Sequence, residues 1–205
     1  MRGVDQGGLY EVEAEDYHAD PCPEPSLSNS LIAMVLSGAP RHAWQAHPQL
    51  NQNYRPSESK RLDLGMVAHK LLLDKGRDYH IIEANSYQTK SAQIARDTAR
   101  ELGKIPILVD DFALAQAMVR ACHEQLADFP GAELAFDLAH GKTELGLFWQ
   151  EPSGVWGRNL IDRLVTEAPT WECWDYKTTS RGADPSDPWF GAHFVEYGYD
   201  TQAAM

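Results

Sequence analysis

The spacing of apolar residues changes near residue 132, and this change constrains the fold more than any other feature of the sequence. Between residues 26 and 130, several segments carry apolar side chains at intervals of three and four, as on one face of a helix. Between residues 132 and 177 the pattern is strand-like and is interrupted by turn-forming residues. Helices followed by an antiparallel meander predict a mixed α/β (α+β) fold.

The first part of the chain is predicted to be mainly helical. Ser26 or Ser28 is expected to cap a helix that continues through Leu36. Further helices are predicted at residues 62–75, 89–102 and 110–127, and the last two are separated by a short apolar run at residues 105–109. Residues 1–25 are expected to form an irregular arm with a short strand at residues 9–12, and residues 40–60, which contain several prolines, to form a loop.

The second part is predicted to hold three strands, at residues 144–150, 155–165 and 172–178. Pro152, Ser153 and Gly154 give the turn that joins the first two strands into a hairpin. A loop is expected at residues 181–192, followed by a helical segment from residue 194 that the end of the chain cuts off.

Length and cysteine content are those of one globular domain in a reducing compartment. A chain of 205 residues, 43% of them hydrophobic, can bury a core without disulfides or metals. The three cysteines are scattered, so we expect no disulfide framework and a cytoplasmic location. The acidic N-terminus lacks the apolar stretch of a secretory signal, and no run approaches the roughly 18 apolar residues that indicate a membrane span.

The net charge of −12 arises from 30 acidic and 18 basic residues. This sign argues against a protein that coats nucleic acid nonspecifically, because such proteins are strongly basic. It is compatible with an enzyme that contacts nucleic acid through a few placed cations, and with a carboxylate site for a divalent ion.

Two aspartates and a lysine form the most informative constellation. Alternation along a strand sets Asp175 and Lys177 on one face and Tyr176 on the other. If the preceding strand is the antiparallel neighbour, Asp162 lies opposite this pair. Carboxylate oxygens are the ligands that Mg²⁺ takes, and a lysine beside them can position water or stabilise charge on a phosphate. On spacing alone, a solvated strand with an ordinary cross-strand ion pair explains the pattern equally well.

Arginines and lysines near this constellation are candidates for phosphate contacts. Arg158, Arg163 and Arg181 flank the predicted site. A second set, at intervals of four, would line one helix face if the helix ran on through Gly103, although a solvated charged face is the commoner explanation. This second set is Arg96, Arg100 and Lys104, extended by Lys90.

Together, several motifs resemble the PD-(D/E)xK nuclease superfamily, and within it the RecB-type and RecE-type exonucleases. The likeness is greatest to phage and prophage proteins described as exodeoxyribonuclease VIII-like. Each motif is weak alone, but their order over nearly the whole chain is fairly specific. The motifs are YHADP (17–21), LSNS (27–30), LGMVAHKLLL (64–73), ELGLFW (144–149), GRNLIDRL (157–164), WDYKTT (174–179) and YGYDTQAA (197–204).

The resemblance implies a role for each matching residue. Asp162 and Asp175 would ligate the metal ions, with the backbone carbonyl of Tyr176 as an extra ligand and His69 as an accessory ligand. Lys177 would handle the nucleophilic water, Glu144 would hold a second metal or a water, and Gln202 would orient the site. The family reaction is hydrolysis of DNA phosphodiester bonds with two Mg²⁺ or Mn²⁺ ions.

The resemblance also sets expectations about domains, partners and cofactors. It implies one restriction-endonuclease-like domain over residues 1–205, with the arm at 1–25, a mainly helical part at 26–130 and the catalytic core at 131–205. Some relatives carry an iron–sulfur cluster on four cysteines, which three cysteines cannot supply. DNA is the expected partner. A single-strand annealing protein and a homo-oligomer are compatible with the family, whose exonucleases form rings around DNA.

One departure from the family pattern bears on activity. The family's glutamine motif has a tyrosine four residues after Gln202, and a further strand follows; both fall beyond Met205. Three readings therefore stay open. The chain is a RecE-type exonuclease on linear duplex DNA, a RecB-like nuclease that cuts single strands or flaps, or a truncated and inactive nuclease fold that binds DNA or a partner protein.

Overall fold

The computed structural model describes residues 3–55, 59–167 and 170–178, together with residues 191, 192, 195 and 202. The chain forms two compact units. The first unit contains residues 1–56, 144–161 and 177–205, and the second contains residues 57–143 and 162–176. The single domain expected from the sequence stays a prediction. Within the described residues, no helix is long and apolar enough to cross a membrane.

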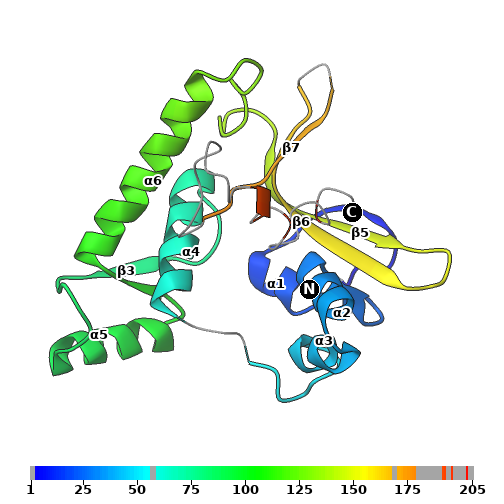
Figure 1. The fold of residues 1–205 in the computed structure, drawn as a ribbon, viewed down its shortest axis with the longest axis horizontal. Helices are drawn as coiled ribbons and strands as arrows, with labels where there is room; N and C mark the ends of the chain where they lie inside the picture. Colours follow the sequence, from blue (N-terminus) through cyan, green and yellow to red (C-terminus); the bar gives the residue numbers. More distant parts are fainter. Residues whose placement is uncertain are drawn as a thin grey trace. The chain divides into compact units, whose positions relative to one another are not determined.

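The first unit is built around a strand hairpin and a short helical N-terminal part (Figure 1). The N-terminal elements are β1 (Gly8–Glu11), α1 (Ala14–His18), β2 (Ser26–Leu27), α2 (Asn29–Ser37) and α3 (Pro40–Ala46). The hairpin strands are β5 (Lys142–Gln150) and β6 (Trp156–Val165). The boundary between the two units falls inside each strand, after residue 143 in β5 and after residue 161 in β6. The sheet order is β1-β5-β6-β2, with β7 (Glu172–Trp174) also paired to β6.

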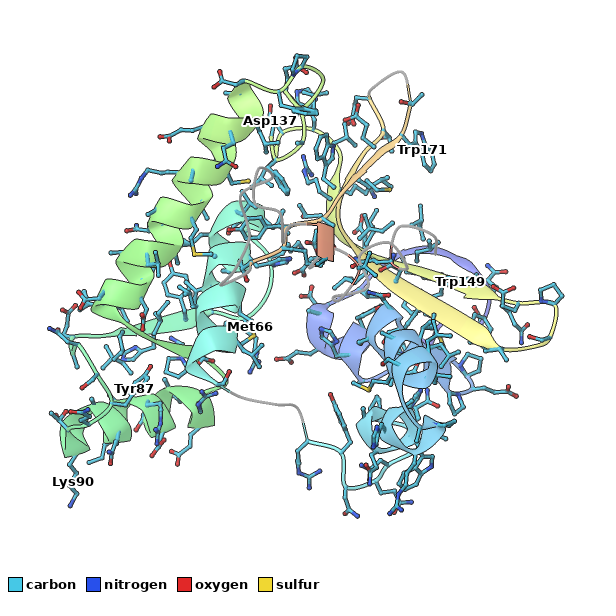
Figure 2. All side chains as sticks on the ribbon, viewed as in Figure 1. Met66, Tyr87, Lys90, Asp137, Trp149 and Trp171 are labelled. Carbon is cyan, nitrogen blue, oxygen red and sulfur yellow. The ribbon has the colours of Figure 1, made fainter. Side chains whose placement is uncertain are left out.

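The hairpin turn forms as the sequence predicts. The Glu151 N–H donates to the Val155 carbonyl over 2.8 Å, and Gly154, at φ 89°, takes the left-handed conformation that glycine allows. Gly157 faces the indole of Trp149, which lies on the same hairpin (Figure 2): a Cβ atom there would lie 2.3 Å from the ring. The ring therefore packs directly on the backbone of β6, and the core beside the hairpin contains Val4, Tyr17, Cys22, Phe148 and Trp156.

The second unit combines a parallel strand pair with three long helices. Its helices are α4 (Lys60–Leu73), α5 (Lys90–Glu101) and α6 (Val109–Ala127), and its strands are β3 (Tyr79–Ile82) and β4 (Ile105–Leu108), besides β7. β3 pairs with β4 in parallel, and α5 forms the crossover between them. Every residue of β4 is buried, as expected for a strand covered by helices.

Local signals set the helix ends. The Ser59 hydroxyl accepts a hydrogen bond from the Leu62 N–H at the start of α4, and Thr89 caps α5 in the same way through the Ala92 N–H. Helix α4 ends at Leu73, two residues before the predicted end at residue 75, and Asp74 caps it in the left-handed conformation, at φ 53°.

The mixed α/β fold class is confirmed, and the structure corrects several local predictions. Residues 40–46 form helix α3 and no loop there, because Pro40 occupies the first turn, where its missing N–H costs nothing. The residue 1–25 arm includes the short helix α1 besides the expected strand. β7 ends at Trp174, four residues before the predicted end. The predicted C-terminal loop and helix lie largely outside the described residues.

Candidate functional site

Asp162 lies on β6 at the point where the pairing with β7 ends. The register is antiparallel, with Arg163 opposite Trp174 and Val165 opposite Glu172. One step further along this register Asp162 would face Asp175, but the described strand stops at Trp174. The Tyr176 N–H instead donates a 2.8 Å hydrogen bond to Asp162 Oδ2. Beyond the last residue of β7, the backbone N–H is therefore bonded to a side-chain carboxylate of β6 and not to a backbone carbonyl.

His69 meets the same carboxylate from helix α4. Its Nε2 atom lies 3.3 Å from Asp162 Oδ1, and the two side chains are 24% and 9% exposed. Val67, Ala68 and Leu72 form the fully packed face of the helix. His69 is therefore on the flank of α4 that faces β6, outside that packed face, as the motif implies.

The ring of Tyr176 is anchored in the apolar core of the second unit. It contacts two groups of buried residues, one around Val67 and Ile107 and one around Leu72 and Phe136. Its centroid lies 6.4 Å from that of Phe136 in an edge-to-face arrangement. Burial raises the pKa of the Tyr176 hydroxyl, with a smaller contribution from Cys122.

Asp175 and Lys177 flank this anchored tyrosine, and both are exposed. An extended backbone sends alternate side chains to opposite sides, so burial of Tyr176 turns its two neighbours outward. The predicted placement of Asp175 and Lys177 on one face is consistent with this exposure. It arises just beyond β7, which ends at Trp174.

A carboxylate and an imidazole on one position suit a divalent cation. Oxygen ligands fit Mg²⁺ and Mn²⁺, and imidazole is a ligand for many divalent metals. In the described part of the chain, no three or more histidine, cysteine, aspartate or glutamate side chains are gathered as a ready-made metal cage. The structure therefore brings together two of the predicted ligands, His69 and Asp162. The remaining positions would fall to Asp175, backbone carbonyls, water or substrate, as is usual for Mg²⁺.

Glu144 and Gln202, the other predicted site residues, lie in the first unit. Glu144 is 4% exposed and sits in β5 with a φ of 51°, in the left-handed region that glutamate rarely adopts. Such a conformation costs on the order of 1 kcal/mol or more and is typical of functional positions. Gln202 is helical and half-buried.

Two arginines predicted to contact phosphate are buried structural residues instead. Arg158 is 3% exposed and its Nη1 lies 2.9 Å from Asp20 Oδ2. Arg163 is 1% exposed and donates to the backbone carbonyls of Asp137 and His140, which fixes the loop before β5. The prediction for these two is wrong because strand alternation gives the face of a side chain but not what covers that face. Arg181 lies outside the described residues.

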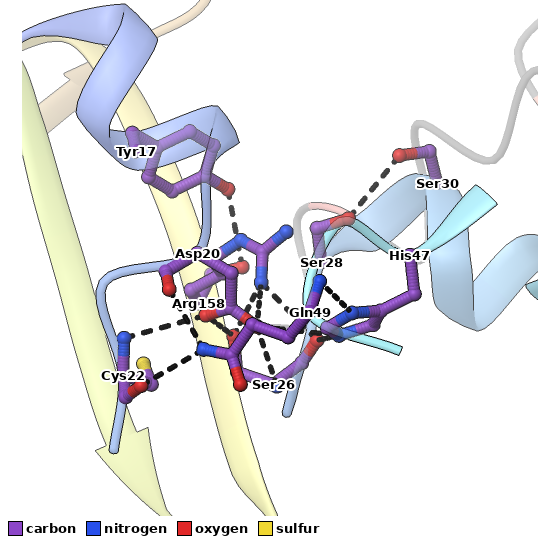
Figure 3. A network of polar contacts seen from close by, with 9 residues as sticks. All are labelled: Tyr17, Asp20, Cys22, Ser26, Ser28, Ser30, His47, Gln49 and Arg158. Carbon is purple, nitrogen blue, oxygen red and sulfur yellow. Dashed lines mark hydrogen bonds and ion pairs between the residues drawn. The ribbon is translucent and has the colours of Figure 1, made fainter. Parts of the chain in front are cut away.

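The network around Arg158 was missed by sequence reasoning (Figure 3). Asp20 Oδ1 accepts from the Ser26 hydroxyl over 2.7 Å, and Oδ2 accepts from the Ser26 N–H over 2.9 Å. His47 Nε2 lies 3.2 Å from Asp20 Oδ2 and 3.0 Å from the Ser26 carbonyl oxygen, while Nδ1 accepts from the Gln49 N–H. Since Nδ1 is an acceptor, the proton of neutral His47 belongs on Nε2. Two of the motifs, YHADP and GRNLIDRL, include Asp20 and Arg158, but neither motif indicates that these residues are partners.

The continuous basic stripe considered for α5, against the commoner alternative of a solvated charged face, does not form. The helix ends at Glu101, and Gly103 takes a φ of 69°, so Lys104 is not in line with the arginines. Arg100 forms a 2.9 Å ion pair with the buried carboxylate of Asp63. Arg96 lies 2.7 Å from Asp97 and stacks over Tyr87 at 5.6 Å. Arg100 thus ties α5 to α4, and the two arginines do not form a plain cationic track.

The family model of the PD-(D/E)XK nuclease superfamily matches residues 26–204. The match spans most of the chain, so this protein belongs to the PD-(D/E)XK nuclease superfamily. Nucleases of this superfamily are metal-dependent hydrolases that act on DNA and generally use Mg²⁺ or Mn²⁺. No curated protein and no solved structure shows a significant match to the chain.

Proposed function

We propose that the protein is a RecE-type exonuclease that hydrolyses phosphodiester bonds of linear duplex DNA in phage-type recombination or repair. Membership of the superfamily supports the hydrolysis of DNA. The finer assignment rests on the order of the motifs and on the histidine helix, which resembles the RecB and RecE branches. A protein of this kind acts in the cytoplasm of a bacterial or phage-infected cell.

The observation that carries the proposal is the environment of Asp162. This carboxylate is 9% exposed as a side chain, and its two oxygens face the imidazole of His69 and the N–H of Tyr176. A solvated surface aspartate would need neither partner. A desolvated carboxylate held in one orientation by two groups is what a metal ligand requires, because its outer partners fix its direction.

The proposed roles follow from this anchor and from the family pattern. His69, Asp162, Asp175 and the carbonyl of Tyr176 hold one or two Mg²⁺ or Mn²⁺ ions, with Glu144 contributing a ligand or holding a water. The bound metal supplies Lewis-acid charge for the entering and leaving oxygens. Lys177 positions the attacking water and stabilises charge on the phosphate. Gln202 orients the site. DNA is the substrate, and an annealing protein and a homo-oligomer belong to the same proposal.

Digestion of matched DNA substrates tests the proposal. End-labelled linear duplex, a covalently closed circle of the same sequence, a single strand and a 5′-flap duplex are incubated with Mg²⁺ and with EDTA. We expect loss of the linear duplex from its ends in Mg²⁺ and no change in the circle. Preferential cutting of the single strand or flap would instead assign a RecB-like activity of different substrate preference.

A variant of the anchor residue supplies the control. Asp162→Asn keeps the shape of the side chain but removes its charge, and should abolish digestion. Asp97→Asn, on an exposed carboxylate of α5, should digest at the unaltered rate. If the unaltered protein binds linear duplex yet digests none of the substrates in Mg²⁺ or Mn²⁺, the protein is an inactive nuclease fold that binds DNA.

A further inference from the structure

An apolar groove opens on the first unit between α2, α3 and the loop that follows α3. Its volume is about 490 Å³. Apolar side chains form its walls: Leu27, Leu31, Pro40, Ala43, Trp44 and Leu50. Trp44 is 49% exposed and Leu50 is 41% exposed. Further along α2, Met34 and Val35 are three and four residues after Leu31, which extends the same helix face.

The floor of the groove is rigid because it is tied to the buried polar network. His47 lines the groove and is 2% exposed, with its ring nitrogens engaged by Asp20, Ser26 and Gln49. Asn51 donates to the Gln45 carbonyl over 2.6 Å, which links the loop back to the end of α3. A cavity held in this way exists before a ligand arrives, so binding costs little ordering of the protein.

The segment that forms the groove differs in charge from the whole chain, and the carboxylate that contacts its lining, Asp20 against His47, is buried and paired with Arg158. Residues 25–57 contain no aspartate or glutamate, and they carry two arginines, Arg41 and Arg55. The remainder of the chain holds all 30 acidic residues and only 16 of the 18 basic ones. Arg41 itself lines the groove and is exposed. The groove is thus an apolar hollow with a cation at its rim, inside the one long acid-free stretch of an acidic protein.

We propose that this groove binds a short acidic peptide segment of a partner protein, which inserts one aromatic or branched apolar side chain beside Trp44 while its carboxylates meet Arg41. The groove suits a side chain better than a nucleic-acid strand. Single-stranded DNA is held by a track of several cations together with stacking aromatics. Here the lining offers one guanidinium and aliphatic walls on most sides. The proposal does not depend on nuclease activity, since binding is measured directly.

Fluorescence anisotropy with defined peptides tests the proposal. The probe is fluorescein-labelled GDDLFDDG, compared with GDDAADDG, which lacks the anchor, and GKKLFKKG, which reverses the charge. We expect GDDLFDDG to bind with a dissociation constant on the order of 10–100 μM. The two comparison peptides should bind at least about tenfold more weakly, because each lacks one of the two required interactions.

Matched variants locate the binding. Trp44→Ala and Leu50→Ala should each weaken GDDLFDDG binding about tenfold, and Arg41→Glu should weaken it while improving GKKLFKKG. Trp171→Ala and Arg120→Glu, on exposed residues of the second unit, should change nothing. Trp171 is labelled in Figure 2. Its exposed fraction is 68%, against 49% for Trp44. Thermal unfolding identifies the variants that remain folded. If Trp44→Ala does not fold, Leu50→Ala tests the groove in its place.

Three results would overturn the proposal. The first is no binding of GDDLFDDG at 1 mM protein, and the second is equal binding of GDDAADDG. The third is an effect of Trp44→Ala on binding of oligothymidine but not of the peptide, which would assign the groove to the DNA strand.

Discussion

The imidazole of His69 and the carboxylate of Asp162 face one another, with Nε2 3.3 Å from Oδ1, while the other carboxylate oxygen accepts the Tyr176 N–H. One side chain thereby links helix α4, strand β6 and the segment after β7. These two contacts hold the carboxylate in one orientation. The positions of His69 and of Asp162 are consequently interdependent, and each can be tested through the other.

Removing the imidazole should weaken metal binding without unfolding the protein. His69→Ala is expected to raise the Mg²⁺ concentration for half-maximal activity roughly 10- to 100-fold, as loss of a ligand or its partner typically does. The free energy of unfolding in EDTA should change by about 1 kcal/mol or less, because His69 is outside the packed face of α4. Mn²⁺ titration by calorimetry, with urea unfolding alongside, measures both quantities.

His80→Ala, on an exposed histidine of β3, is the control for His69→Ala. It should leave the Mn²⁺ isotherm and the Mg²⁺ dependence unchanged. An unchanged Mn²⁺ isotherm in His69→Ala would show that His69 contacts Asp162 but does not contribute to metal binding.

The buried ion pair of the first unit should be among the most sensitive positions in the protein. Arg158→Met leaves the Asp20 carboxylate, whose side chain is fully buried, without its cation. Breaking one side of such a pair typically costs 3–5 kcal/mol, because an uncompensated charge stays buried. Urea unfolding monitored by tryptophan fluorescence measures the loss. Asp20→Asn combined with Arg158→Met should recover part of it.

The exposed pair Arg96–Asp97 provides the comparison for the buried pair. Both partners are more than a third exposed, so solvent screening limits the ion pair, and Arg96→Met, which also removes the stacking over Tyr87, should cost at most about 1 kcal/mol. Comparable losses in Arg96→Met and Arg158→Met would show that burial of the Asp20–Arg158 pair carries no special weight.

The sequence predicts the helices and the hairpin of this protein well because both are local patterns. The periods of α2, α4, α5 and α6, and the Pro-Ser-Gly turn between β5 and β6, depend on residues within a few positions of one another. The prolines of residues 40–60 suggest a loop, yet Pro40 begins helix α3, because proline is well placed in a first turn. The parallel pairing of β3 with β4 joins residues 26 apart and leaves no local sign beyond the apolar run.

The candidate site divides in the same way between local and distant relationships. Alternation predicted that Tyr176 and its neighbours point in opposite directions, because that follows from the extended backbone alone. The same reasoning placed Arg158 and Arg163 on DNA, since nothing near them in sequence reveals their partners. Asp20 lies 138 positions before Arg158, and His47 joins them from a third segment. Contacts of this kind are decided by the packing of the fold.

Alkaline pH should destabilise the first unit through two buried groups. Burial raises the pKa of the Tyr17 hydroxyl from 10.0 to about 12, and the pKa of the Cys22 thiol from 9.0 to about 11. Both groups fold as neutral acids, so their contribution to stability is complete below pH 9. Above that pH the unfolded chain releases its protons first, and stability falls as pH rises to about 12. Thermal unfolding between pH 8 and pH 12 measures the decline.

Two substitutions separate these contributions to the alkaline decline. Cys22→Ala should remove the part that begins near pH 9, and Tyr17→Phe should remove the part above pH 10, which amounts to at most roughly 3 kcal/mol for a two-unit shift. A profile that is the same in Tyr17→Phe as in the unaltered protein would contradict the assignment.

A substitution of Lys177 distinguishes most sharply between the hypothesis that the protein is a nuclease and the hypothesis that Lys177 is an ordinary surface residue. As a catalytic residue, its ammonium group stabilises charge that develops only in the transition state, and its loss should lower the rate on the order of 10²- to 10³-fold. As an exposed surface cation, its loss would cost little stability and nothing in turnover. Lys177→Met, which keeps the aliphatic stem, should therefore bind linear duplex in Ca²⁺ almost normally and fail to digest it in Mg²⁺.

Single-turnover digestion, with DNA binding measured by anisotropy, gives the two readouts for Lys177. Lys75→Met, on an exposed lysine beyond the end of α4, controls for loss of a charge and should digest at the unaltered rate. A loss of less than tenfold in Lys177→Met would show that the lysine has no catalytic role. Equal losses of binding and of rate would instead make it a DNA contact, because a group used only in the transition state leaves ground-state binding intact.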